Sequence, residues 1–197
     1  YRFVYASPGL TLGILPNAMV LDAFEQQRLP AQQDRYAVPL SVLHRRGQVV
    51  WMEFLGASPA PAVEALTDAV QQLTFFRASA SPRVARVFSR VHIRHLYPGI
   101  TLLLHATPEG PRYDFWLEPG ADPQQLRIAL RGASNLTLSP DGRELRLWWA
   151  AEHPIVLHSQ LQAYQAVGAH LRPVPVRFAL QKLPDGTPTV HFELGAY

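Results

Sequence analysis

The chain has 197 residues, enough for one large domain or two joined halves, and its 48% hydrophobic and 17% charged residues suffice for a folded core. A net charge of +3 is too small to indicate a nucleic-acid-binding protein. The sequence contains no cysteine, which excludes disulfides, thiolate metal sites and cysteine nucleophiles, and no apolar run reaches the roughly 18 residues of a membrane-spanning helix.

Short apolar runs separated by 18 prolines and 12 glycines indicate an antiparallel all-β domain. Turn residues that accept tight backbone geometry join three pairs of these runs into hairpins. In chain order the predicted hairpins are Thr11–Leu15 with Ala18–Leu21, Leu136–Leu138 with Glu144–Leu147, and Val176–Leu180 with Thr189–Leu194.

After the first hairpin, the period of the apolar residues changes over residues 61–76. Apolar side chains recur there every three or four residues, at Val63, Leu66, Val70, Leu73 and Phe76. This spacing predicts one amphipathic helix of about three to four turns. We therefore expect a helical insertion at about residues 59–77, between a half at residues 1–58 and a half at residues 86–197.

Two segments, residues 51–58 and 128–134, share the pattern of a strand followed by a turn. Such an echo fits a duplicated unit, although three shared letters also arise by chance. The expected fold is mainly β, an antiparallel β-sandwich over residues 1–197, with one or two helical insertions and with halves that could be related.

Three of the four tryptophans are predicted to lie on strand faces opposite the core. Alternate residues of a strand share a face, and regular apolar residues mark the buried one. The predicted buried sets are Val50, Met52 and Phe54; Tyr113, Phe115 and Leu117; and Leu145, Leu147 and Trp149. The opposite faces therefore carry Trp51, Trp116 and Trp148, with Asp114 and Arg146 as hydrogen-bonding neighbours.

Three interpretations fit outward indoles beside charged groups. The indoles pack inside the molecule, contact a neighbouring domain or partner protein, or stack on a glycan. In the glycan interpretation the ligand-binding residues are Trp116, Trp148, Asp114, Arg146 and Trp51.

Residue types that carry chemistry do not form a catalytic or metal-binding pattern. His92, His95 and His105 gather around one turn, but residues three apart on a strand face opposite sides and no adjacent carboxylate completes a site. Glu118 and Asp122 bracket a turn, which does not indicate a pair of glycosidase acids. Serine elbows, phosphate loops and calcium loops are absent from the sequence. We expect no enzyme, no metal and no cofactor, and a hydrolase is the third alternative.

The most basic segment carries Arg83, Arg86, Arg90 and Arg94. These arginines are interleaved with apolar residues, as on the solvent side of one element, and not gathered into a phosphate-binding track. We expect no nucleic-acid partner.

Residues 91–142 contain four short motifs in a fixed order. They are Leu96-Tyr97-Pro98-Gly99-Ile100, Tyr113-Asp114-Phe115, Glu118-Pro119-Gly120-Ala121-Asp122-Pro123 and Arg131-Gly132-Ala133-Ser134. In this order they resemble the uncharacterised extracellular domain found N-terminal to seven-bladed beta-propeller (SBBP) repeats in large exported bacterial proteins. The resemblance covers most of the chain and is weakest over residues 58–90.

The resemblance implies a non-catalytic structural or adhesive module of a secreted or cell-surface bacterial multidomain protein. Its implied partners are the downstream domains of the same polypeptide, with a glycan or another surface protein as further candidates. A carbohydrate-binding module is the alternative. Residues 1–5 lack the layout of a signal peptide, so we expect the chain to be one domain of a longer protein.

Overall fold

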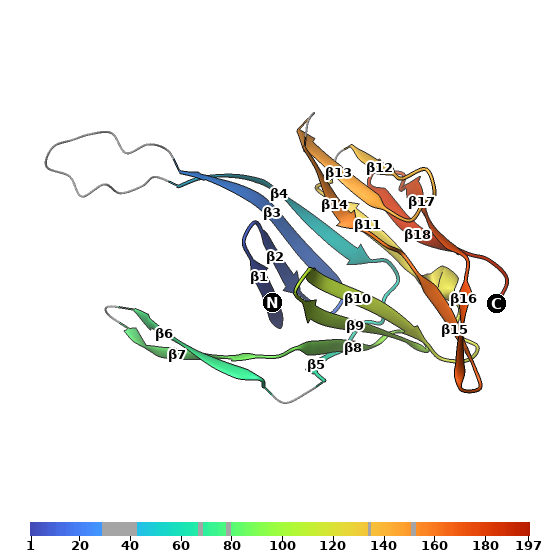
Figure 1. Cartoon of the computed structure of the whole chain (residues 1–197), viewed down its shortest axis with the longest axis horizontal. Helices are drawn as coiled ribbons and strands as arrows, with labels where there is room; N and C mark the ends of the chain where they lie inside the picture. The colour runs from blue at the N-terminus through green and yellow to red at the C-terminus, as the bar shows by residue number, and fades with distance from the viewer. Residues whose placement is uncertain (29–42, 67–68, 78–79, 134, 151–152) are drawn as a thin grey trace, which may run out of the picture.

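A computed structural model gives the fold (Figure 1). It describes the backbone of residues 1–28, 43–66, 69–77, 80–133, 135–150 and 153–197, and the side chains of residues 1–25, 46–66, 69–74, 84–133, 135–148 and 157–197. The elements are β1 (Phe3–Ser7), β2 (Leu10–Ile14), β3 (Ala18–Arg28), β4 (Leu43–Phe54), β5 (Ala62–Ala65), β6 (Gln71–Arg77), β7 (Ala80–Val87), β8 (Arg90–Tyr97), β9 (Ile100–Thr107), β10 (Gly110–Leu117), η1 (Pro123–Gln125), β11 (Arg127–Arg131), β12 (Leu136–Leu138), β13 (Leu145–Ala150), β14 (His153–His158), β15 (Ala163–Val167), β16 (His170–Val174), β17 (Val176–Lys182) and β18 (Pro188–Leu194).

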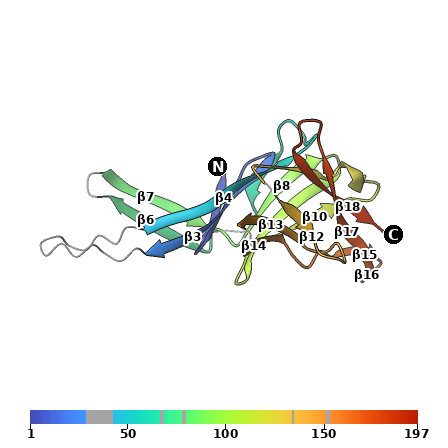
Figure 2. The ribbon, with the colours of Figure 1, turned by 90° about the horizontal axis from the view of Figure 1, so that it is seen from above.

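The described strands pair antiparallel into three larger sheets and two separate hairpins. The larger sheets have the orders β1-β2-β3-β4-β11-β18-β17, β10-β9-β8-β5 and β12-β13-β14, and the hairpins are β6-β7 and β15-β16. In the seven-stranded sheet, Ile128 of β11 pairs with Phe54 of β4 on one side and with Val190 of β18 on the other. Strand β11, the fifth in this order, thus joins the N-terminal meander to the C-terminal hairpin. Figures 1 and 2 show that the β6-β7 hairpin and the far ends of β3 and β4 extend from the body on the same side.

One hydrophobic core joins the three larger sheets. Each sheet turns its alternating apolar residues inward, and each fully buried aliphatic side chain contributes about 1.5–3 kcal/mol relative to exposure. Residues with 0% exposure come from all three sheets: Met19, Val50, Ile128, Leu130 and Val190; Ile93 and Leu102; and Leu145 and Leu147.

Aromatic rings connect the sheets at one end of this core. Phe115 of β10 packs edge-on against Phe54 of β4, with centroids 6.3 Å apart, and against Phe192 of β18 at 5.7 Å. Tyr113, two residues earlier on β10, packs against His158 of β14 at 5.3 Å. Edge-to-face rings at these separations add to the energy of area burial, so β10 is held to both other sheets.

The prediction of a mainly β, antiparallel fold is confirmed, as are the three predicted hairpins. They correspond to β2-β3, β12-β13 and β17-β18. Gly142 and Gly186 have φ angles of 69° and 82°, the backbone conformation that favours glycine in such turns. The echoing segments lie side by side, because β4 and β11 are paired, and each strand is followed within two residues by a glycine of positive φ.

The predicted helical insertion is wrong. The described residues of 61–76 form β5 and most of β6, and η1 is the one helical element within the part of the chain that the structure describes. The β5 backbone completes the edge of β8, with Ala62 opposite Arg94, and β6 pairs with β7. Leu66, Val70 and Leu73 are exposed, so the spacing that suggested an amphipathic helix does not face the core.

Alanine substitutions at two separate glycines test how closely the backbone that follows β11 approaches β4. Gly132 has φ of 81°, and a Cβ there would lie 2.6 Å from the carbonyl oxygen of Val49. Gly186 has nearly the same φ, but a Cβ there would meet nothing within 4 Å. Gly186→Ala should cost about 1 kcal/mol from the backbone conformation alone, whereas Gly132→Ala should cost about 3 kcal/mol because the clash adds to the strain. Equal losses in urea denaturation of the two variants would contradict this.

Candidate binding faces

The four-stranded sheet presents a charged outer surface, which we call the polar face. Its central row runs across all four strands as Glu64 of β5, His92 of β8, Leu103 of β9 and Asp114 of β10, each paired with the next. Neighbours on the strands Val91, Ile93, Leu102 and Leu104 are buried on the other side. Paired strands lie about 4.8 Å apart, so these outward side chains form a regular lattice.

Each carboxylate of the polar face is shared by two basic groups. The Glu64 carboxylate lies 3.2 Å from Nε2 of His92 and 3.0 Å from the Arg94 guanidinium. Hydrogen bonds from His92 and then Arg94 lower the pKa of Glu64 below its ordinary value. Asp114 lies 3.2 Å from His105 and 2.9 Å from Arg112.

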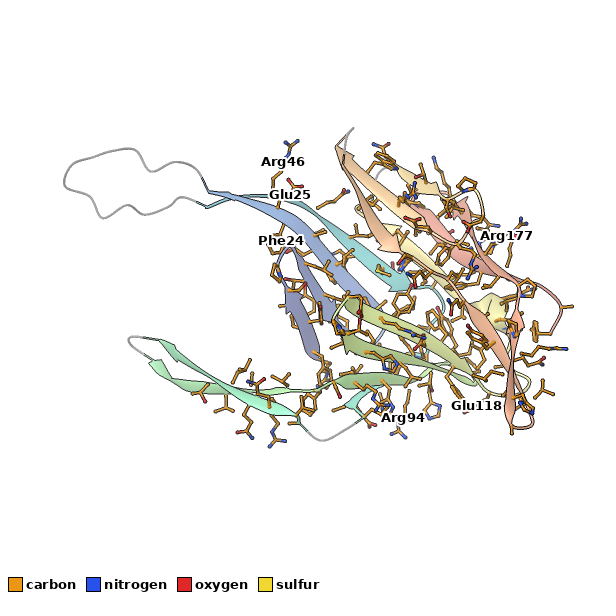
Figure 3. All side chains as sticks on the ribbon, viewed as in Figure 1. Phe24, Glu25, Arg46, Arg94, Glu118 and Arg177 are labelled. Atoms are coloured by element: carbon orange, nitrogen blue, oxygen red, sulfur yellow. The ribbon has the colours of Figure 1, made fainter. Side chains whose placement is uncertain are left out.

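Figure 3 shows Arg94 directed away from the body beside β8. Among the described arginines of the basic segment, Arg86 and Arg90 are also exposed, and Arg94 is paired with Glu64. The Arg83 side chain lies outside the described residues.

Trp116 lies on this same face, two residues after Asp114 on β10 and directly opposite Thr101 of β9. Its exposed fraction is 64%, so the indole is accessible at the edge of the sheet. The structure therefore brings together two of the predicted ligand-binding residues, Trp116 and Asp114.

Sequence analysis missed the carboxylate partners of two histidines on the polar face. Glu64 lies beside His92 and Asp114 beside His105, although neither pair completes a metal site among the described residues. Glu64 reaches His92 only because β5 is a strand paired with β8, and that segment was predicted to be helical. The alternation of Arg112, Asp114 and Trp116 is the signal that could have marked the β10 side.

No group of three or more His, Cys, Asp or Glu side chains that could hold a metal occurs among the described residues. His95 stands apart from the other two histidines, exposed at a bulge in β8 with φ of 54°.

The Glu118 and Asp122 segment forms a turn scaffold. A Cβ added at Gly99 would lie 3.0 Å from the Ala121 Cβ, and the Glu118 N–H donates to the Gly99 carbonyl at 2.9 Å. The Asp122 carboxylate accepts a hydrogen bond from the Gln124 N–H at 2.9 Å and begins η1. Two of the four short motifs of residues 91–142 thus meet in space and stabilise turns.

Trp148 and Arg146 lie on a different surface, the outer face of β13. Trp148 is partly buried, and its indole Nε1–H donates to the Thr137 hydroxyl of β12 at 2.9 Å. The Arg146 guanidinium pairs with both carboxylate oxygens of Glu144 at 3.0 Å. Leu145 and Leu147 are buried as predicted, and the side chain of Trp149 lies outside the described residues.

Trp51 lies on a third surface, the outer face of the seven-stranded sheet. Val50, Met52 and Phe54 are buried as predicted, and 46% of Trp51 is exposed. Its cross-strand neighbour is Arg131 of β11. The predicted ligand-binding residues are therefore divided among three outer faces: Trp116 with Asp114, Trp148 with Arg146, and Trp51 alone.

Two hollows of the structure are lined by residues other than these tryptophans. One of about 330 Å³ is lined by Asp141, Arg143, Glu144, Gln160 and Gln162. A second of about 290 Å³ lies beside the Ser139–Gly142 turn and β17. A ligand that contacts Trp116 or Trp51 would lie outside these two hollows.

A family model described as a domain of unknown function (DUF7948) matches residues 1–197. Neither the curated proteins nor the solved structures contain a match. Among the described residues, no helix has the length and apolar character needed to cross a membrane.

Proposed function

Because the chain belongs to the family described as a domain of unknown function (DUF7948) over its whole length, we propose that it is a non-catalytic structural and adhesive module of a larger bacterial protein. The observation that carries the proposal is where its motif residues and its exposed aromatic residues lie in the structure. Gly99, Ala121 and Asp122 shape turns, whereas exposed aromatic side chains such as Trp116 lie on outer sheet faces. A module of this kind contacts its neighbours through its surface and not through an enclosed pocket.

The resemblance to domains N-terminal to SBBP repeats supports the setting of this proposal. In that setting the protein is secreted or attached to the cell surface, and the downstream domains of the same polypeptide are its first partners. Protease treatment of intact producing cells tests the location. Loss of the module from the cells while a cytoplasmic marker persists is the expected result, and its protection until lysis would contradict the proposal.

A structural role in the parent protein predicts coupling between the module and the segment that follows it. The chain produced together with that segment should unfold at a higher temperature than the chain alone, because a shared interface binds only the folded module. Trp51→Ala and Trp116→Ala, each made in both forms, identify the face involved. Identical unfolding temperatures for the two wild-type forms would contradict the structural role.

The polar face supports carbohydrate binding as a second candidate function. Trp116 offers an exposed indole, and Asp114, held by His105 and Arg112, offers an oriented hydrogen-bond acceptor beside it. Aromatic surface with a few fixed polar groups suits a sugar ring. Retention of the chain in native gels that contain soluble polysaccharides tests this candidate, and unchanged mobility across neutral and anionic polysaccharides would contradict it.

A further inference from the structure

A second aromatic surface lies on the outer face of the seven-stranded sheet. One row of directly paired residues crosses five strands there: Val4 of β1, Gly13 of β2, Val20 of β3, Trp51 of β4 and Arg131 of β11. Leu12 and Ile14, on either side of Gly13, are buried in the core, so Gly13 faces outward.

The ring of Tyr1 occupies the space above Gly13. A Cβ added at Gly13 would lie 2.4 Å from Cε1 of Tyr1 and 2.8 Å from its Cζ. The Arg2 N–H donates to the Ile14 carbonyl at 2.8 Å, which fixes the backbone next to Tyr1. Only glycine leaves room for the ring, so the sheet carries a tyrosine on its surface at this position.

Val20 lies between the two rings, paired with Gly13 on one side and with Trp51 on the other. Although Val20 faces outward, its exposed fraction is 4%, while Tyr1 is 67% and Trp51 is 46% exposed. We call Tyr1, Val20 and Trp51 the aromatic shelf. Its two accessible rings stand two strands apart, a separation of about 10 Å given strand spacings near 4.8 Å.

Polar groups border the shelf and are held in place. The Arg131 Nε–H donates to the Glu53 carboxylate at 2.7 Å, and its Nη1 lies 3.4 Å from Asp185 and 3.3 Å from the Thr187 hydroxyl. The hydrogen bond with Glu53 is the main cause that raises the pKa of Arg131 above its ordinary value. These ion pairs leave no excess positive charge beside Trp51 that would favour an anionic ligand.

We infer that the aromatic shelf binds a neutral, extended β-linked polysaccharide, which lies across strands β2, β3 and β4. One sugar ring stacks on Tyr1 and another on Trp51. The separation of about 10 Å is close to the disaccharide repeat of an extended β-1,4-linked chain, so alternate sugar rings meet the two side chains. Hydroxyl groups near Trp51 reach Glu53 and Arg131, which the salt bridges hold in fixed positions.

This inference deepens the carbohydrate-binding candidate and rests on it, but it assigns the site to Tyr1 and Trp51. The inference also requires an oligosaccharide of a minimum length. Cellobiose cannot stack on both rings and reach the polar groups, whereas cellotetraose and cellohexaose can. Affinity should therefore rise steeply between the disaccharide and the tetrasaccharide and change little after that.

The test is isothermal titration of the chain with cellobiose, cellotetraose, cellohexaose and hydroxyethyl cellulose, with polygalacturonate as the anionic comparison. Trp51→Ala and Tyr1→Ala should each weaken binding of cellohexaose about tenfold, as expected for the loss of one stacked ring. Trp51→Tyr keeps a ring and should stay within about threefold of wild type by the same reasoning. Tyr164→Ala is the matched control, since it removes an exposed ring from the separate β15-β16 hairpin, and Trp116→Ala tests the polar face.

Each contrary outcome has a distinct meaning. No binding of any polysaccharide by the wild type overturns both the inference and the carbohydrate-binding candidate. Loss of binding in Trp116→Ala, with Trp51→Ala unchanged, overturns the shelf and keeps the candidate function on the polar face. Preference for polygalacturonate overturns the neutral ligand class. Thermal unfolding of each variant shows whether a loss of binding reflects a loss of folding, and Trp51→Tyr retains the test if Trp51→Ala does not fold.

Discussion

Acidification from pH 6.5 to pH 4 is expected to remove about 3 kcal/mol from the free energy of unfolding through His158 alone. Burial among the rings of Tyr113 and Phe178 lowers the pKa of this histidine from 6.5 to about 4. Its Nδ1 lies 3.0 Å from the Tyr113 hydroxyl, with which the neutral imidazole shares a hydrogen bond. Each pKa unit corresponds to about 1.4 kcal/mol, which gives the size of the effect.

The direction follows from proton binding in the two states. Between pH 6.5 and 4 the unfolded chain protonates His158 while the folded chain keeps it neutral, so the unfolded state binds more protons and stability falls as the pH falls. Below about pH 4 both states are protonated and this loss is complete. Carboxylates with lowered pKa values, such as Glu144 beside Arg146, lose their contribution only below their ordinary pKa of 4.5.

The measurement is urea denaturation of wild type and His158→Phe at several pH values between 7.5 and 4. The variant loses a hydrogen bond to Tyr113 and should be less stable at neutral pH, but its stability should depend less on pH over this window. Tyr113→Phe, which keeps the buried imidazole, should retain the wild-type dependence. Parallel curves for wild type and His158→Phe would show that His158 does not titrate as the structure requires.

Phe115→Ala is expected to cost about 3 kcal/mol, whereas Trp116→Ala should change stability by no more than about 0.5 kcal/mol. The two residues are adjacent on β10 and point to opposite faces. Phe115 packs against Phe54 and Phe192 of the seven-stranded sheet, and its loss leaves a cavity where two sheets meet. Trp116 is exposed beside Thr101 and fills no space in the core.

Chemical denaturation of both variants measures this contrast directly. It also tests the face assignment without any ligand, because a reversed strand would exchange the two values. If Trp116→Ala is the more destabilising change, the indole is a packing residue and the polar face is covered in the folded protein.

Local sequence patterns predicted the strands that have one buried face. Val50, Met52 and Phe54 alternate because the side chains of a strand alternate between its faces, and Asp185-Gly186 is a pair of residues that favours a turn between two strands. The exposure of Trp51 and Trp116 followed from the same rule. These features depend on neighbours within a few residues.

Features that depend on distant pairing were not predictable in this way. Residues 62–65 form a strand because the edge of β8 accepts their backbone, and nothing in their own spacing shows this. Glu64 therefore reaches His92 from 28 residues away. The aromatic shelf was missed for the same reason, since Tyr1 and Trp51 become neighbours only through the register of β2, β3 and β4.

The position of β11 between β4 and β18 imposes an order on folding. The meander β1 to β4 consists of successive hairpins and can form early, but it then presents β4 as an open edge that bears Val50, Met52 and Phe54. The edge of β4 stays unpaired until β11, which lies much later in the chain, pairs with it. Strand β18 can join the sheet only after β11 is in place. Pairing between distant segments is slow, and an open apolar edge can pair with another chain. During synthesis, we expect this protein to be most exposed to aggregation in the interval before β11 is available to pair with β4.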